Sequence, residues 1–381
     1  MNQNRTREIK IGTIIIGGSH PVVLQSMTAT KTTNIVATAE TCQHLTEAGA
    51  GIVRIAVDTQ QDAISLREIR KRTTANLSVD LQENYRLAEF VAPYVDKIRY
   101  NPGHLHHAEP EISWQKKVER IVETARKYDC ALRIGVNCGS LNPPDAARDL
   151  TFNNTLDNAL DSTLDSALNS ALKHADFIDS LDFRRFCVSI KSSDPATVIL
   201  ANRRFAVLRS DIPLHLGLTE AGMPPEGVMK SRLALEPLLS EGIGNTLRVS
   251  LTVPNERKHE EIEAGKLILH NVKHGNILTV TDWTPDRLNI ISCPSCARVE
   301  NERFVALAQQ VRAATRFMKE VPLTVAVMGC RVNGPGETDH ADIGLWCGAK
   351  SVNLKRGTNL LGTFSYDEIV QKLLKELEQF Q

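Results

Sequence analysis

The sequence of 381 residues lacks a net charge, since 45 Lys and Arg residues balance 45 Asp and Glu residues. This balance gives no bulk electrostatic reason to expect nucleic acid or an anionic membrane surface as a partner, so any anion-binding site must be local. The sequence also lacks an apolar segment in its first residues, MNQNRTREIK, and any apolar run long enough to span a bilayer. We therefore expect a cytoplasmic protein that binds neither nucleic acid nor membranes.

Cysteine is scarce as well: eight cysteines are too few for a disulfide-stabilised scaffold of this length. In a reducing compartment they would remain thiols, so their spacing is the informative property. No expected strand is followed by a G-x-G-x-x-G turn, which argues against a dinucleotide-binding fold.

Short β-branched runs alternate with longer amphipathic segments from residue 10 to about residue 254, as in repeated βα units around a parallel sheet. Eight such runs favour a closed (β/α)8 barrel, the TIM barrel, over an open doubly wound sheet. A hairpin is expected before the barrel, at residues 9–18. The expected barrel strands lie at residues 22–27, 51–57, 76–81, 96–101, 131–137, 185–192, 213–218 and 245–251.

Two segments depart from this pattern. Residues 155–172 place a leucine at every fourth position, which predicts a surface helix between two strands. A proline and dense charge in VPNERKHEE, residues 253–261, end the strand pattern. We therefore expect a barrel over residues 1–254 and a smaller α/β unit over residues 255–381, with the boundary within 253–286. The smaller unit should contain a helix from about 297 to 318, a strand at 323–329 and a closing helix near 366–379.

Three cysteines look related: Cys293 and Cys296 in ISCPSCARVE, and Cys330 in MGCRVNGPGE. A C-x-x-C pair serves zinc, iron–sulfur and redox-disulfide sites alike, but a redox pair needs no third cysteine and structural zinc normally needs a fourth Cys or His. Three thiolates leave one position for substrate or for a weaker oxygen ligand, for which Glu337 is the candidate. The residues favour a reactive iron–sulfur site over zinc.

The surroundings of these cysteines agree with a cluster. Glycines at 334 and 336 would leave room for it, and Cys296 would open the predicted helix, whose dipole favours thiolates. Two alternatives stay open. Cys347 could complete a four-cysteine zinc site, and NGPGE could be an ordinary surface turn after a buried Cys330.

Cations interrupt the apolar runs of five expected barrel strands. An unpaired buried charge costs several kcal/mol, so each cation needs an anion. Cations from several strands would converge on the face where barrel enzymes hold their active sites, and guanidinium groups match phosphate oxygens. We therefore expect a phosphate- or diphosphate-bearing substrate, unless carboxylates such as Asp80, Glu83 and Glu220 neutralise the charges. The five cations are Arg54, Arg99, Arg133, Lys191 and Arg248.

Further polar residues accompany these strands and suit a substrate cavity. Glu220 near five cations should stay ionised unless substrate or a metal site perturbs it, so that it could donate a proton to the reaction. The accompanying residues are Asn137, Ser140, His215, Glu220 and Ser250.

The segments CPSC, VAVMGCRVNGPGE, QSMTATKT, IVRIAV, RIGVNCGSL, HLGLTEAG and GIGNTLRVSLT run over most of the chain. Together they resemble the bacterial 4-hydroxy-3-methylbut-2-enyl diphosphate synthases of the methylerythritol phosphate pathway of isoprenoid biosynthesis. The resemblance implies a TIM barrel joined to a small domain related to the cluster domain of sulfite and nitrite reductases. It also implies a head-to-tail homodimer in which the barrel of one subunit faces the cluster of the other.

The same resemblance implies an activity and a ligand set. The substrate would be 2-C-methyl-D-erythritol 2,4-cyclodiphosphate, opened reductively with two electrons from flavodoxin or ferredoxin. Glu220 and His215 would face the chemistry, and we add the hypothesis that Glu337 gives way to substrate on iron. The ligands implied for a [4Fe-4S] cluster are Cys293, Cys296, Cys330 and Glu337. The residues implied for diphosphate binding are Arg54, Arg99, Arg133, Asn137, Lys191, Arg248 and Ser250.

Two rival functions remain on the residues alone. One is a non-redox phosphate-binding barrel whose small domain is held by zinc on four cysteines. The other is an electron-transfer protein, which explains a cluster but leaves the barrel cations without a role. Iron, sulfide and zinc analysis of anaerobically purified protein separates them.

Overall fold

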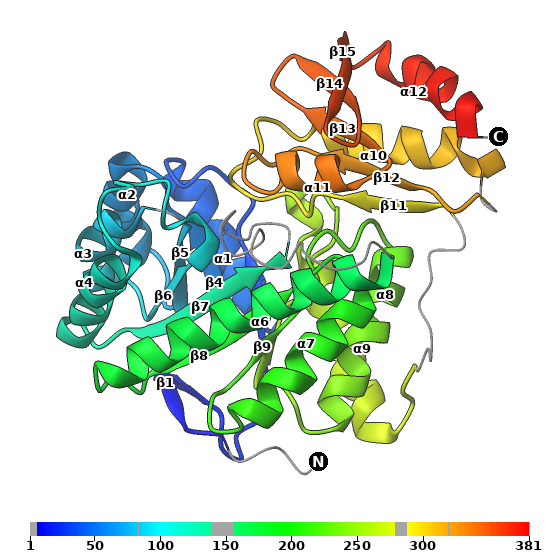
Figure 1. The fold of residues 1–381 in the computed structure, drawn as a ribbon. Coiled ribbons are helices and arrows are strands. Elements are labelled where there is room, and N and C mark those ends of the chain that lie inside the picture. The colour runs from blue at the N-terminus through cyan, green and yellow to red at the C-terminus, as the bar shows by residue number, and fades with distance from the viewer. Residues whose placement is uncertain (1–5, 83, 139–155, 279–287, 319–320, 381) are drawn as a thin grey trace.

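The computed structural model describes residues 6–82, 84–138, 156–278, 288–318 and 321–380 (Figure 1). Eight parallel strands form a nearly closed barrel in the order β8-β7-β6-β5-β4-β3-β10-β9, and an isolated parallel bridge from Val188 to Leu214 joins its two ends. The predicted TIM barrel is confirmed. Its strands are β3 (Val23–Met27), β4 (Ile52–Ala56), β5 (Leu77–Gln82), β6 (Lys97–Tyr100), β7 (Ala131–Asn137), β8 (Phe186–Lys191), β9 (His215–Leu216) and β10 (Thr246–Leu247).

Helices cover the outside of the barrel, as Figure 1 shows. Polar caps fix where several of them begin: Thr59 and Asp62 form a capping box at α2, and Asp194 accepts from the backbone of Thr197 at α7. The helices are α1 (Ile35–Glu47), α2 (Gln60–Arg70), α3 (Ala88–Val91), α4 (Trp114–Lys127), α6 (Leu156–Ser180), α7 (Pro195–Leu208), α8 (Glu226–Ser240) and α9 (His259–His274). Short 3-10 turns lie at Tyr85–Leu87, Ala92–Tyr94, Pro102–His104 and Asn255–Arg257.

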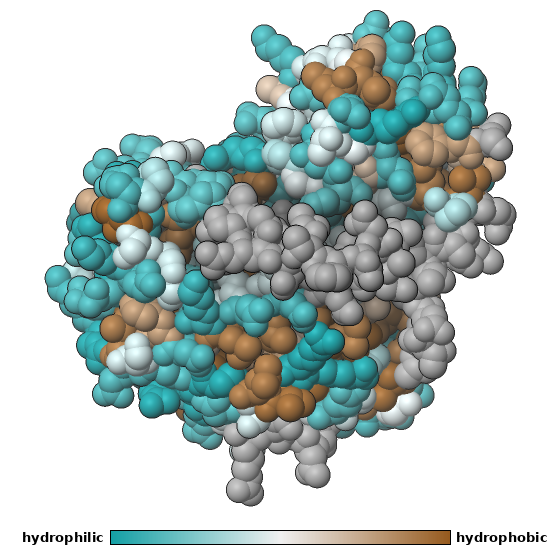
Figure 2. All heavy atoms as spheres, viewed as in Figure 1, coloured by the Kyte–Doolittle hydropathy of each residue, from teal (hydrophilic) through white to brown (hydrophobic). Residues whose placement is uncertain are grey.

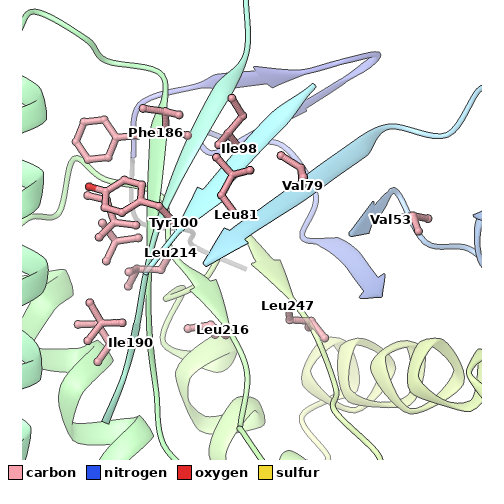
Figure 3. Packing of buried hydrophobic residues seen from close by; sticks show 14 of the residues in the cluster. Val53, Val79, Leu81, Ile98, Tyr100, Phe186, Ile190, Leu214, Leu216 and Leu247 are labelled. Atoms are coloured by element: carbon pink, nitrogen blue, oxygen red, sulfur yellow. The ribbon is translucent and has the colours of Figure 1, made fainter. Parts of the chain in front are cut away.

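Strand alternation divides each barrel strand between two environments. In β7, Leu132, Ile134 and Val136 join the apolar core, while the buried Arg133 lies on the opposite face, inside the barrel. Figure 3 shows part of the apolar core between strands and helices, including Ile98, Tyr100, Phe186 and Leu216. The main apolar core therefore lies around the sheet, while the inner face of the barrel carries polar side chains such as Arg133 together with a smaller apolar cluster that contains Ile52 and Ala131.

The hairpin and the leucine-rich segment also form as predicted. β1 (Ile9–Ile11) pairs antiparallel with β2 (Ile14–Ile16) and packs its isoleucines against Ile52, Ala131 and Cys187. The leucine repeat forms the first part of α6, between β7 and β8, and buries Leu164 and Leu168 against the barrel core.

The C-terminal unit is built on a mixed five-stranded sheet with its own apolar core. Its strands are β11 (Asn289–Ser292), β12 (Thr324–Met328), β13 (Ile343–Cys347), β14 (Ser351–Arg356) and β15 (Asn359–Ser365). Its helices are α10 (Arg303–Ala314), α11 (Gly334–His340) and α12 (Ile369–Leu377), with 3-10 turns at Arg316–Met318 and Glu378–Phe380. In Figure 1 this unit lies over one end of the barrel.

The predicted helix from about 297 was wrong in its start. α10 begins at Arg303, where the side chain of Asn301 accepts a hydrogen bond from the Arg303 backbone N–H at 2.9 Å. Before it, the chain turns at Cys296 and Val299 bridges to Cys330. Cys296 therefore does not open a helix, and the dipole of α10 offers it no support.

The boundary between the two units stays a prediction. Helix α9 lies after residue 254, yet its residues Ile262, Ala264, Ile268 and Val272 belong to the barrel core. This packing favours the later part of the predicted range, after His274.

The described residues contain no helix that is long and apolar enough to cross a membrane. Hydrophobic and hydrophilic side chains are interspersed over the face of the molecule in Figure 2. Among the exposed apolar residues are Leu360 and Leu361 on β15, which lies at the edge of its sheet.

Candidate functional site

One cavity of about 80 Å³ lies between the end of the barrel and the C-terminal unit. Both units contribute to its lining, so the structure brings together residues that are up to 306 positions apart in the sequence, from Met27 to Asn333. The predicted site residues that line it are Arg54, Arg99, Arg133, Asn137, Lys191, Glu220, Arg248, Ser250, Cys293, Cys296 and Cys330. His215 and Glu337 lie next to this group rather than in the lining, and Ser140 and Glu83 fall outside the described residues.

Carboxylates neutralise only part of the positive charge in the cavity. Asp80 accepts from Arg99 at 2.9 Å and lies 3.6 Å from Arg54, while Glu261 lies 3.4 Å from Arg248. Among the described residues, no carboxylate forms an ion pair with Arg133 or Lys191, and Nε and Nη1 of Arg133 have no hydrogen-bond partner. Within the described ranges, which exclude Glu83, the alternative that carboxylates satisfy all five cations therefore fails for these two.

Burial, and then the neighbouring cations, lower the pKa values of Lys191 and Arg133. Burial, and then the charges of Arg133, Arg54 and Arg248, hold the pKa of Lys191 well below its usual range. Burial, and then Arg99, lower the pKa of Arg133 to about 10. Both shifts mean that positive charge is unfavourable in the cavity as it stands, so a bound polyanion would relieve it.

Three thiols form the wall of the cavity opposite the cations. Cys293 follows β11 and Cys330 follows β12, two neighbouring parallel strands whose ends lie side by side. The Cys330 thiol lies within hydrogen-bonding reach of the thiols of Cys293 and Cys296. Contact with Cys293, and then burial, raise the pKa of Cys330 to about 12.

The three thiols are suitable donor groups for a metal cofactor, although their sulfur atoms are not spaced as ligands of a bound metal. No group of three or more His, Cys, Asp or Glu residues in the described ranges is arranged as a metal site. Three converging sulfur atoms, those of Cys293 and Cys330 on buried residues and that of Cys296 on a partly buried one, are nevertheless the donor set of iron–sulfur clusters, and metal binding would displace thiol protons. The residues therefore fit a sulfur-ligated group.

Glu337 lies in the first turn of α11 rather than in a loop, because Pro335 fits the first turn of a helix. Its carboxyl group faces Glu220 and Ser193. Burial, and then the neighbouring Glu220, raise the pKa of Glu337 well above its usual range. Its role as a fourth ligand stays a prediction, since its partners here are not the thiols.

Gly334 has a packing reason for lacking a side chain. A Cβ atom at this position would lie 2.9 Å from Nε1 of Trp346 and 3.0 Å from its Cδ1. The residue is therefore needed for packing against β13, and its role in leaving room for a cluster stays a prediction.

Glu220 and His215 differ in how they are held. Glu220 lines the cavity in a left-handed conformation, with φ +48°, and its Oε1 accepts a hydrogen bond from Nδ2 of Asn333 at 2.9 Å. His215 is fully buried, and its Nδ1 lies 2.7 Å from Oγ1 of Thr246. Burial, and then Lys191, hold the pKa of His215 well below its usual range, so its ring is neutral.

Cys347 does not complete a four-cysteine site. It is buried in β13, where its thiol donates to the backbone of Leu345 at 3.7 Å and neighbours Tyr366. The zinc alternative thereby loses its fourth ligand.

The sequence reasoning missed two residues of the C-terminal unit that line the cavity. Asn333 lies three residues after Cys330, and Arg298 lies two residues after Cys296. Their closeness to the cysteines was the available signal, but their partners on the barrel were not visible in the sequence.

Comparison with known proteins gives matches over both units. Residues 6–266 match the family model described as the GcpE TIM-barrel domain, and residues 289–379 match the GcpE protein C-terminal domain. A curated Rhodopirellula baltica protein named 4-hydroxy-3-methylbut-2-en-1-yl diphosphate synthase (flavodoxin) is 56% identical over 378 residues, which cover 99% of this chain and 97% of that protein. A Persephonella marina protein of the same name is 37% identical over 388 residues, covering 100% and 99%.

Solved structures give a weaker match. A crystal structure of dihydropteroate synthase from Stenotrophomonas maltophilia has a TM-score of 0.48 and 11% identity, and the match covers 70% of this chain and 98% of that one. This TM-score is too low to support an inference.

Proposed function

The chain belongs to the GcpE family, and on this premise we propose that it is an iron–sulfur oxidoreductase of isoprenoid biosynthesis. Its reaction would convert 2-C-methyl-D-erythritol 2,4-cyclodiphosphate to 4-hydroxy-3-methylbut-2-enyl diphosphate. The observation that carries the proposal is that the barrel cations and the three thiols line the same cavity. A zinc-stabilised barrel would need the fourth cysteine that the described residues do not place there.

The barrel cations would bind and orient the cyclic diphosphate. Arg133 and Lys191 have no carboxylate partner among the described residues and so offer their charge to the substrate, with Asn137 and Ser250 as further lining donors. Guanidinium groups bind phosphate oxygens through paired hydrogen bonds, which fixes both position and orientation. The methylerythritol carbons would then face the thiol wall.

The thiolates of Cys293, Cys296 and Cys330 would hold a [4Fe-4S] cluster, with Glu337 as the proposed fourth ligand. When bound, such a cluster supplies electrons one at a time and a Lewis-acidic iron. To serve as this ligand, the Glu337 carboxylate would have to leave Glu220. A carboxylate is a more exchangeable ligand than a thiolate, so we propose that Glu337 would hold the coordination position that stays open to substrate.

The reaction balances with two electrons and one proton. The bond between C2 and the phosphate-bearing oxygen breaks, and that oxygen stays on the diphosphate. The C3 hydroxyl leaves as water, a double bond forms between C2 and C3, and the proton completes the water. Glu220 is the lining acid that could hold this proton, with Asn333 orienting its carboxyl group at 2.9 Å. His215, neutral and buried, would lie close to Lys191 beside the cavity.

The relatives' names include flavodoxin, and we propose a reduced flavodoxin as the electron donor, with ferredoxin as the alternative. The cytoplasm is the proposed location, because the eight free thiols suit a reducing compartment.

We also propose a homodimer. In the structure one chain lines the whole cavity, whereas the family resemblance places the cysteines of one subunit over the barrel of the other. Exchange of the C-terminal units between two chains would preserve every contact and change only which chain supplies it. Mixing Cys330→Ala and Arg248→Ala proteins, each inactive or weak alone, should then restore activity. A mixture no more active than its components would mean that each chain completes its own site.

The central experiment is anaerobic purification followed by iron, sulfide and zinc analysis and a turnover assay with the cyclic diphosphate. We expect about four iron and four sulfide per chain, reductant-dependent formation of the allylic diphosphate, and two electrons consumed per product. A colourless protein with one zinc per chain and no iron would disprove the proposal.

A further inference from the structure

Asp58 is a contact point between the barrel and both cysteine segments. It follows strand β4 and accepts hydrogen bonds from two arginines that flank the thiols. Arg298, two residues after Cys296, donates from Nε and Nη2 to Oδ1 of Asp58 at 3.1 and 3.0 Å. Arg331, next to Cys330, donates from Nη2 to Oδ2 at 2.7 Å. One barrel carboxylate therefore holds both segments.

Arg298 is also joined to the substrate cations through Asp80. Its Nη1 lies 3.4 Å from Oδ2 of Asp80, and its Nη2 donates to the Asp80 backbone oxygen at 3.0 Å. The same carboxylate accepts from Arg99 at 2.9 Å and lies 3.6 Å from Arg54. The position of Arg298 is therefore fixed relative to two of the five cations.

Burial distinguishes this contact from an ordinary surface ion pair. The side chains of Arg298 and Asp80 are 5% and 2% exposed, whereas that of Arg331 is 51% exposed. Exposed pairs contribute little, but a buried guanidinium with several acceptors has one preferred geometry. Lys31 holds the adjacent backbone as well, donating from Nζ to Ala297 O at 2.9 Å and to Val299 O at 2.7 Å.

We propose that Arg298, acting through Asp58 and Asp80, is a positioning residue that sets the distance between the three cysteines and the substrate cations. The inference rests on the proposed function, in which the reducing group and the substrate must meet in one geometry. A misplacement of about 1 Å can lower the rate about 100-fold. In a dimer with exchanged units the same contact would join two subunits.

The test compares Arg298→Gln, Asp58→Asn and the double variant with wild type. We expect unchanged iron and sulfide per chain, a fall in kcat of about tenfold or more, and a smaller change in KM. The double variant should lose less than the sum of the two single losses, since both substitutions break the contact between Arg298 and Asp58. Arg298→Lys should recover part of the loss. Arg312→Gln is the matched control, because Arg312 pairs with Glu226 at another place between the two units and should leave kcat unchanged.

A second readout does not depend on turnover. In cluster-free full-length protein, alkylation followed by peptide mass analysis measures how freely each thiol reacts. Cys296 and Cys330 should react several-fold faster in Arg298→Gln than in wild type, while Cys42, buried in α1, should be unchanged. Faster reaction of Cys42 would reveal a folding defect in Arg298→Gln. The same thiol reactivities and kcat, measured on Asp58→Asn and Arg298→Lys, would then test the proposal.

The outcomes separate the two proposals. Unchanged kcat and unchanged thiol reactivity in the variants, or strictly additive losses in the double variant, would overturn the role of Arg298. Absence of turnover in wild type would instead refute the proposed function, and the thiol reactivities would still decide whether Arg298 positions the cysteines.

Discussion

The two walls of the cavity are held in different ways. On the barrel wall, the cations stand on or directly after strands whose backbones are fixed by the barrel's own sheet. On the opposite wall, the thiols stand on segments that follow β11 and β12, and contacts with the barrel hold those segments. The barrel wall is thus preformed, while the thiol wall depends on how the two units meet.

The two walls also differ in their effect on the free energy of folding. The barrel concentrates charge that lacks counter-ions, which opposes folding until an anion arrives. The thiols carry no such uncompensated charge and pack as small apolar groups in the core of the C-terminal unit. Substitutions on the thiol wall should therefore affect chemistry with little effect on substrate binding, and substitutions on the barrel wall should affect binding and stability together.

The largest expected effect is that of Cys330→Ala. Removing the thiol that neighbours both Cys293 and Cys296 should abolish iron retention and turnover. Binding of the cyclic diphosphate, measured by calorimetry on cluster-free protein, should stay within about twofold of wild type. Turnover with full iron content would contradict the ligand assignment. Cys347→Ala is the matched control and should retain its iron.

Glu337→Ala should come next. We expect a cluster that assembles but is lost faster to a chelator, and a loss of most turnover, because the exchangeable oxygen ligand is gone. Time courses of iron release and the rate of product formation measure both effects. Full activity in this variant would exclude the proposed ligand role.

Arg133→Met should separate binding from stability on the barrel wall. A charge-assisted hydrogen bond contributes about 1.5–3 kcal/mol, so substrate binding should weaken about 10- to 100-fold. The substrate-free protein should become more stable, because a buried cation with unpaired nitrogens is replaced by an apolar side chain of similar length. Calorimetry and thermal unfolding measure the two effects, and a lower Tm together with unchanged binding would refute both expectations.

The smallest effect concerns Lys97, which is buried inside the barrel and donates to Oε1 of Gln25 at 2.8 Å. Burial lowers its pKa from 10.5 to about 7. Above pH 7 the unfolded chain holds this proton and the folded chain does not, so folding becomes more favourable as pH rises from about 7 towards 10.5.

Lys97→Met should reduce the increase in the free energy of unfolding between pH 7 and 10.5 by up to a few kcal/mol. Urea unfolding of both proteins at neutral and mildly alkaline pH gives the difference, which cancels the contribution of the other titrating groups. The exposed Lys71→Met serves as the control, and equal pH profiles for wild type and Lys97→Met would show that Lys97 stays charged in the barrel.

The barrel was predictable because its signal is local and repeated. Hydrophobic alternation in segments such as ALRIGVN requires only that strands form, and the interruption of that pattern by Arg133 marks a side chain facing the interior. That the three cysteines lie together was predictable from their sequence motifs, whereas their role as cluster ligands stays a prediction. The start of α10 was not, because the turn from Cys296 to Glu302 is stabilised by a bridge to Cys330, more than 30 residues away in the sequence.

The sequence by itself determined the barrel, the chemistry of the donor groups and the family of the chain, because these depend on residue types at short spacings. Only the tertiary structure decided that Glu337 faces Glu220, that Arg133 and Lys191 lack carboxylate partners among the described residues, and that Arg298 reaches Asp58 and Asp80. The physical reason is that charge pairing and burial depend on distances in space, and those distances are set by packing between segments far apart in the chain.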